Sequence, residues 1–172
     1  SENPDVLICG PYGNSIIKDL KGIIKVGYFC ENIYPDLRIC DYAFGIPHEK
    51  MINSPRYFRI QWQGFDPKKL VKENINAETI LSIKTKFCNY VYSNRVPFRE
   101  HFFKELSKYK SVDAPGRSMT NMPSIDQIYP GDRFEAKRRF QADYKFTLAI
   151  ENYVFPGYQT EKLYDSMLSS TI

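Results

Sequence analysis

Polar residues gather in two short groups near the end of the chain. Glu151-Asn152 follows an apolar run, and Thr160-Glu161-Lys162 comes after a turn at Pro156-Gly157. If the second group begins a helix, the free N–H groups of its first turn favour an anion such as phosphate, and Lys162 adds a full charge. The Glu161 carboxylate could accept hydrogen bonds from both hydroxyls of a ribose. Thr-x-Glu-Lys is also common capping chemistry at the start of a helix, so these residues alone leave both interpretations open.

The elements around these groups favour a ligand site. Residues 144–150 predict a strand, and ligands of α/β sheets bind at the carboxyl ends of strands. The helix predicted from Thr160 has Leu163, Met167 and Leu168 on one face, which we expect to be buried.

A strand and a helix of the same kind are predicted further upstream. Residues 86–92 read as a strand, followed by Ser93-Asn94 and a helix that opens near Pro97. Asp132 followed by Glu135 resembles a capping box for a helix through Arg139. The core face of the helix from Pro97 is predicted from apolar residues three or four positions apart: Phe98, Phe102, Leu106 and Tyr109.

The first part of the chain predicts strands at residues 5–9, 23–30 and 57–62. Residues 63–79 are polar and irregular, which is typical of a linker. We therefore expect an α/β protein of two units, residues 1–75 and 76–172, of which the second has the strand-helix-strand-helix order of a Rossmann-like nucleotide-binding unit.

Composition limits the class of protein. The chain has 172 residues, 42% hydrophobic and 15% aromatic, which is too apolar for a disordered chain. Its net charge of +4 is spread along the sequence, whereas nucleic-acid binders concentrate theirs. No apolar run has the length of a membrane span. The four cysteines lack zinc or redox spacing, so we expect small buried hydrophobes in a reducing compartment: Cys9, Cys30, Cys40 and Cys88.

Taken together, the terminal groups resemble the donor signature of the α1,3/α1,4-fucosyltransferase family. In that family a strand ends Phe-Glu-Asn, and Tyr-x-Thr-Glu-Lys opens a helix. Here Ile150 replaces the aromatic residue, Cys30 stands where the family often has Gly, and the loop at residues 112–122 differs from bacterial members. The stretches that carry the resemblance are 28–32, 41–45, 57–59, 90–94, Phe98-Arg99, 150–152 and 158–162.

The resemblance implies a GT-B architecture, in which two Rossmann-like domains face a cleft, and this chain is too short for both in full. We expect a fragment, or a reduced bacterial-type member, that ends where the family continues. The implied activity is transfer of fucose from GDP-fucose, with inversion, to a hydroxyl of an N-acetylglucosamine- or glucose-containing glycan. The implied partners are GDP-fucose and an oligosaccharide acceptor, without nucleic acid.

The resemblance also assigns roles to residues. Glu31 would be the catalytic base that takes the acceptor proton. No Asp-x-Asp sequence occurs, so no visible motif requires a divalent metal, and no tightly bound cofactor is expected. Arg99 and Lys162 would instead meet the charge of the departing diphosphate. The remaining donor-binding residues would be Asn152, Tyr158 and Glu161, with Ser93 and Asn94 as weaker contacts.

Two other functions remain open at this point. The chain could be a non-catalytic nucleotide-sugar-binding module, or a nucleic-acid-binding domain that uses the basic cluster Arg133, Lys137, Arg138 and Arg139. We expect a bacterial cytoplasmic location. A eukaryotic member would face the Golgi lumen, and membrane association would require segments absent here.

Overall fold

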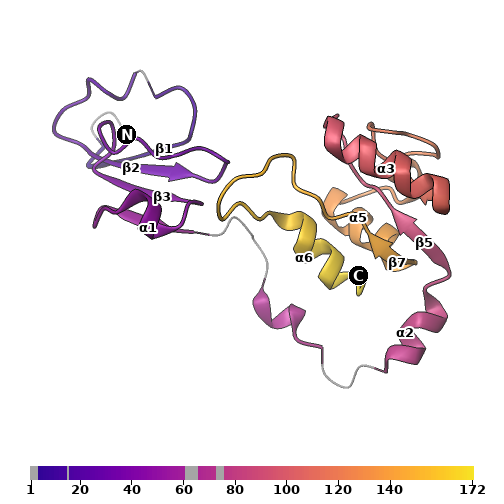
Figure 1. Cartoon of the computed structure of the whole chain (residues 1–172). Helices are drawn as coiled ribbons and strands as arrows, with labels where there is room; N and C mark the ends of the chain where they lie inside the picture. The colour runs from indigo at the N-terminus through magenta and orange to yellow at the C-terminus, as the bar shows by residue number, and fades with distance from the viewer. Residues whose placement is uncertain (1–3, 15, 61–65, 73–75) are drawn as a thin grey trace. The chain divides into compact units, whose positions relative to one another are not determined.

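The computed structural model describes residues 4–14, 16–60, 66–72 and 76–172, which form two compact units (Figure 1). Unit 1 is Ser1–Gln63 with Tyr153–Thr160, and unit 2 is Gly64–Asn152 with Glu161–Ile172. The sequence predicts a single boundary after residue 75. In the structure the first boundary follows residue 63, and the short segment from Tyr153 belongs to the first unit.

Unit 1 is built on a parallel sheet with the strand order β1-β2-β3-β4 (Figure 1). Its elements are β1 (Val6–Cys9), β2 (Ile24–Phe29), β3 (Tyr42–Gly45), α1 (Glu49–Ile52) and β4 (Tyr57–Arg59).

One face of this sheet is buried. Alternate side chains along a strand point to opposite faces, so Phe29 is buried while its neighbour Tyr28 is exposed. The core contains Cys9, Phe29, Cys40, Ala43 and Tyr57. Strands β1 and β2 lie within the predicted ranges. β4 ends at Arg59, Ile60 lies outside it, and the last two positions of the predicted strand, 61–62, lie outside the described residues.

Unit 2 is built on a parallel sheet with the strand order β6-β5-β7. Its elements are η1 (Pro67–Leu70), α2 (Ala77–Ile83), β5 (Lys86–Asn89), α3 (Pro97–Tyr109), β6 (Val112–Asp113), α4 (Ile125–Ile128), α5 (Arg133–Ala142), β7 (Tyr144–Thr147) and α6 (Glu161–Leu168). The two parallel sheets confirm the predicted α/β class.

Helix α3 begins at Pro97 as predicted, and Leu106 packs against the core as predicted, but the other three positions of the predicted core face are wrong. Phe98, Phe102 and Tyr109 are exposed, while Arg99 and Phe103 are buried. The spacing of apolar residues does not predict this face, because its largest buried residue is a cation. A charged side chain in a sequence pattern is normally expected at the surface.

In helices α5 and α6, polar side chains take part in capping and packing. The Asp132 carboxylate accepts a hydrogen bond from the Glu135 N–H at 2.8 Å, which is one of the two bonds of the predicted capping box and caps α5. In α6, however, Met167 is exposed and the buried residues are Asp165 and Ser166. The predicted apolar face of α6 is therefore wrong at Met167.

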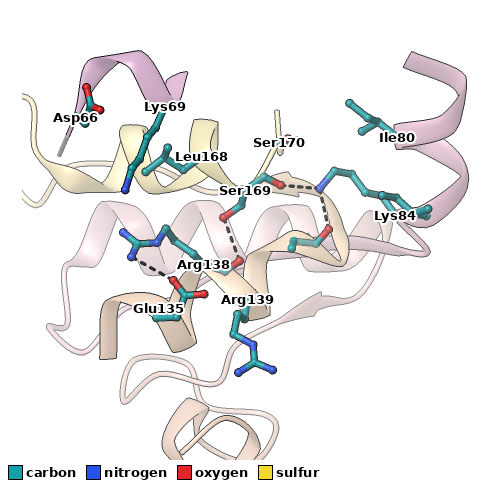
Figure 2. A pocket seen from close by; sticks show the side chains of 12 residues that line it. Asp66, Lys69, Ile80, Lys84, Glu135, Arg138, Arg139, Leu168, Ser169 and Ser170 are labelled. Carbon is teal, nitrogen blue, oxygen red and sulfur yellow. Dashed lines mark hydrogen bonds and ion pairs between the residues drawn. The ribbon is translucent and has the colours of Figure 1, made fainter. Parts of the chain in front are cut away.

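Part of the predicted linker is helical. Residues 67–70 form η1 and residue 77 begins α2, whereas 63–65 and 73–75 lie outside the described residues. Lys84, just after α2, is buried and donates from Nζ to the carbonyl oxygens of Ala142 (2.8 Å) and Ser169 (2.9 Å) (Figure 2). These bonds tie the end of α2 to the ends of α5 and α6, so this stretch is part of unit 2 and not a free linker.

Candidate functional site

The guanidinium of Arg99 is the most buried charge at the predicted site, with 1% of the residue exposed. Nη2 donates to the carbonyl of Asn94 at 2.9 Å, and Nη1 donates to the carbonyl of Ile150 at 3.4 Å. Its carbon Cζ lies 4.0 Å from the ring centre of Tyr92. Among the described residues Arg99 forms no ion pair, and its Nε has no hydrogen-bond partner. Arg99 thus joins the loop after β5 to the loop after β7 while keeping an uncompensated charge.

Tyr92 organises the chain that leaves β7. Its hydroxyl lies 2.5 Å from the carbonyl oxygen of Leu148 and 2.9 Å from that of Ile150, and accepts a hydrogen bond from the Ile150 N–H at 2.6 Å. Burial raises the pKa of this phenol far above its ordinary value, so it stays protonated at neutral pH. These contacts hold the chain just before Glu151-Asn152.

Lys162, in the first turn of α6, lies between two carboxylates. Its Nζ is 3.0 Å from Glu151 Oε2 and 3.6 Å from Glu161 Oε1. The structure therefore brings together three residues of the terminal groups within unit 2. A cation that is already paired with carboxylates must exchange at least one of them to hold a phosphate.

The other residues of unit 2 that are predicted to bind the sugar donor differ in their surroundings. Asn152 has a buried Oδ1 without a hydrogen-bond partner in the described part of the chain. Ser93 and Asn94 are exposed, and Ser93 Oγ accepts from Arg133 at 3.3 Å. A buried amide oxygen without a protein partner is unusual in a folded protein, and a bound ligand or an ordered water molecule can satisfy it.

The predicted catalytic base and one residue predicted to bind the sugar donor lie in unit 1. Glu31 follows the end of β2, and the Tyr158 hydroxyl donates to its Oε2 at 3.4 Å. Tyr158 belongs to the same sequence motif as Glu161 and Lys162. In the structure, however, the segment that contains Tyr158 packs on unit 1.

Two further contacts fix the segment of residues 153–160 on unit 1. The rings of Tyr34 and Phe155 lie 5.0 Å apart between centres. Gly157 has a left-handed φ of +78°, and a Cβ there would lie 2.7 Å from the carbonyl oxygen of Ile46. Glycine is required here both for its backbone conformation and for this close approach.

The basic cluster of α5 is engaged within unit 2. Lys137 pairs with the buried Asp165 at 2.9 Å, and Arg138 lies 3.6 Å from the same carboxylate. Arg139 lies over the ring of Tyr129, with 5.0 Å from its Cζ to the ring centre. These cations serve the packing of α5 on its neighbours.

A cavity of about 670 Å³ lies between α2, α5 and the end of α6, away from the predicted site. Figure 2 shows Lys84, Arg138 and Ser169 at its wall, and no predicted site residue lines it. Within the described residues, no group of three or more His, Cys, Asp or Glu side chains could hold a metal ion. No helix in the described ranges has the length and apolar character needed to cross a bilayer.

Two features of the site are not predicted by the sequence, namely the role of Tyr92 and the partner of Glu151. Tyr92 holds the chain before Glu151-Asn152, and Glu151 itself is the partner of Lys162. Glu151 was visible as part of the terminal motif. Nothing in the sequence indicates the Tyr92 contacts, because they join positions 56 and 58 residues apart.

The fold and this set of residues define an α/β protein with polar groups and a buried cation at the carboxyl ends of parallel strands. The model of glycosyltransferase family 10 (fucosyltransferase), C-terminal part, matches residues 81–172, just over half of the chain. This chain therefore belongs to the fucosyltransferases of glycosyltransferase family 10.

Known proteins agree with this assignment. The alpha-(1,3)-fucosyltransferase FucT of Helicobacter pylori is 25% identical over 205 residues, covering 100% of this chain and 41% of the relative. The 3-galactosyl-N-acetylglucosaminide 4-alpha-L-fucosyltransferase FUT3 of Pongo pygmaeus is 36% identical over 92 residues, covering 52% of this chain and 22% of the relative.

A solved α1,3-fucosyltransferase structure shares the fold, with a TM-score of 0.74 at 24% identity, over 98% of this chain and 55% of that one. This likeness confirms the predicted GT-B type of fold. The chain spans about half of that solved structure and less than half of the two curated relatives.

Proposed function

We propose that this chain contributes the donor-binding and base residues of an enzyme that transfers fucose from GDP-fucose to a sugar hydroxyl with inversion. The acceptor would be an N-acetylglucosamine- or glucose-containing glycan. The observation that carries the proposal is the site in unit 2, where Lys162, Glu161 and Glu151 meet at the start of α6 within the family-matched region. Related solved α1,3-fucosyltransferase structures include one with GDP-fucose and one with GDP.

The charges of unit 2 support binding of a diphosphate. An uncompensated buried cation such as Arg99 is costly unless an anion binds near it. Lys162 can exchange a carboxylate for a phosphate oxygen at the N-terminus of α6, where the helix dipole also favours an anion. Asn152, with its unpaired Oδ1, can accept a hydrogen bond from the donor.

Glu31 would supply the base. As the acceptor oxygen attacks the anomeric carbon, its proton passes to the Glu31 carboxylate. The bond from that carbon to the phosphate oxygen breaks, and its electron pair leaves with GDP from the opposite face of the sugar. The Tyr158 hydroxyl can orient the carboxylate through its hydrogen bond to Oε2. Arg99 and Lys162 would stabilise the charge that develops on the diphosphate.

Calorimetric titration tests the donor site. With chelator present, we expect the chain to bind GDP-fucose and GDP but not UDP. Lys162→Ala should weaken GDP binding about 10- to 100-fold, because a hydrogen bond between charged groups contributes about 1.5–3 kcal/mol. Lys104→Ala removes an exposed charge from α3 and should bind as the wild type does. Equal affinity for all three nucleotides, or none, would contradict the proposed donor.

An activity assay tests the base. Glu31→Gln keeps the shape of the side chain but cannot accept the proton, so transfer to a glycan acceptor should fall at least 1,000-fold while GDP affinity changes less than twofold. Residual turnover within tenfold of the wild type would show that another group is the base.

A second candidate is a nucleotide-sugar-binding module without turnover. The contacts of Lys162 with Glu151 and Glu161 in unit 2 fit such a module equally well, because nucleotide binding does not require the base. GDP binding without transfer by the unmodified chain would support it. Nucleic-acid binding gains no support, since Lys137 and Arg138 pair with Asp165 and Arg139 stacks on Tyr129.

A further inference from the structure

Two thiols meet in the core of unit 1, although their strands are not neighbours. Cys9 is the last residue of β1, and Cys40 precedes β3. Strand β2 lies between them in the sheet. The two Sγ atoms are 3.6 Å apart, and both residues are buried, with 7% and 3% of their surface exposed.

Gly27 of β2 makes this meeting possible. It is the register partner of Cys9 on one side and of Ala43 on the other. A Cβ at Gly27 would lie 2.3 Å from the Phe29 ring and 2.9 Å from the Cys40 Sγ, so this ring and the sulfur together occupy the space that a side chain would fill. The absence of a side chain at this point lets the two sulfurs touch over the middle strand.

We propose that Cys9 and Cys40 are a site of disulfide formation, with a small-molecule disulfide as the oxidant. One thiolate attacks the oxidant to give a mixed disulfide and releases one thiol. The second cysteine then displaces the other half of the oxidant, so the pair loses two electrons and two protons and the oxidant becomes two thiols. This inference is independent of the proposed function.

The geometry selects this pair. A disulfide needs about 2.0 Å between the sulfurs, so they must approach by roughly 1.6 Å. Because β2 lies between the two strands, this approach requires backbone movement as well as side-chain rotation. Among the four cysteines, all within the described residues, no other sulfurs are in contact, and Cys88 belongs to unit 2. The product would link β1 to the entry of β3, on either side of the strand that leads to Glu31.

Burial controls the rate of the reaction. It is the main reason why the pKa of the Cys40 thiol is raised to about 12, with its bond to Cys9 adding to the effect. The reactive thiolate is therefore scarce at neutral pH, and the oxidant reaches it only when unit 1 opens. Oxidation should be slow at pH 7 and at least tenfold faster at pH 9 or in mild urea.

The test exposes the purified chain to excess oxidised glutathione, a linear small-molecule disulfide, at pH 8.5. After acid quenching, denaturation and alkylation, mass spectrometry counts the free thiols and identifies linked peptides. We expect the four free thiols to fall to two, with one peptide pair joined through Cys9 and Cys40. The melting temperature of unit 1 should rise by about 5–10 °C, because the link closes a loop of about 31 residues.

Single variants identify the partners. Cys30→Ala and Cys88→Ala should keep the cross-link, while Cys9→Ala and Cys40→Ala should abolish it. Because the last two change the core, the peptide map of the unmodified chain decides the outcome. Four thiols surviving prolonged oxidation, or a link through Cys30 or Cys88, would overturn the proposal.

Discussion

At the scale of single residues, Arg99 combines a full charge with a position that the solvent does not reach. Its guanidinium is held by two backbone carbonyls and an aromatic ring, which satisfy its geometry but leave its charge without a counterion among the described residues. Its hydrogen bonds contribute to the stability of unit 2, apart from the donor-binding role proposed for this residue. Substitution of Arg99 is therefore expected to lower stability as well as the proposed nucleotide affinity.

Arg99→Lys should destabilise unit 2 by about 2–3 kcal/mol. A single ammonium lacks the planar fork that reaches the carbonyls of both Asn94 and Ile150, and one buried acceptor is then left unpaired. Urea unfolding of the full chain measures the change. Arg95→Ala removes a side chain that is 79% exposed and should cost less than about 0.5 kcal/mol. Equal costs for the two variants would show that the buried hydrogen bonds of Arg99 contribute nothing.

The candidate site could be predicted from sequence as a set of residue types, but not as a set of contacts. The Thr-Glu-Lys group and the preceding Glu-Asn contain the residue types of the candidate site near the end of the chain. The pairing of Lys162 with Glu151 depends on how far the chain turns between them, which local patterns do not specify. The donor and base roles of these residues stay predictions.

At the scale of elements, the segment of residues 153–160 is the least expected feature. The sequence on both sides of it belongs to unit 2, yet it packs on unit 1 through Phe155, Gly157 and Tyr158. Hydrophobic periodicity reports local structure, and it carries no information about which unit an irregular loop contacts. The same limit explains β3, a four-residue strand that was not predicted because its short pattern leaves Tyr42 exposed.

Gly157→Ala tests the packing of this segment. Alanine at φ +78° is strained, and its Cβ would also approach the Ile46 carbonyl oxygen to 2.7 Å. Gly13 has a φ of +77° with open space around it, so Gly13→Ala carries the backbone strain alone. We expect Gly157→Ala to cost at least about 1 kcal/mol more than Gly13→Ala. Hydrogen exchange of residues 153–160 should accelerate about fivefold or more only in Gly157→Ala, and similar exchange in both variants would contradict the contact.

At the scale of the whole molecule, the parallel sheets and the class of fold followed from the sequence. Long apolar runs identify β1, β2 and β5, and Pro97 marks the start of α3. The buried faces of α3 and α6 did not follow, because Arg99 and Asp165 are buried through partners distant in the sequence. Composition and periodicity thus predict layers, whereas buried charges require the tertiary structure.

Alkaline pH should destabilise unit 1 through Tyr57. Burial raises the pKa of this phenol to about 12, and its hydroxyl donates to the Pro47 carbonyl at 2.7 Å. The unfolded chain loses the proton near pH 10 while the folded chain keeps it, so stability is complete below pH 10 and falls as the pH rises toward 12. Urea unfolding at pH 8, 10 and 11 should show a shallower fall for Tyr57→Phe. Tyr42→Phe, at an exposed position of β3, should keep the wild-type slope, and an unchanged slope in Tyr57→Phe would contradict this origin.

The chain passes between the two units after Gln63, after Asn152 and after Thr160. A protease that cuts once between residues 63 and 64 would therefore leave residues 1–63 without a covalent link to residues 64–172, associated through the packing of the segment 153–160 within unit 1. A gene cut at the same point would give a first piece without the loop that carries Tyr158, and a second piece with that loop attached but without its packing surface. Exchange of whole units between related enzymes by a single crossover thus separates Glu31 from the tyrosine that contacts it.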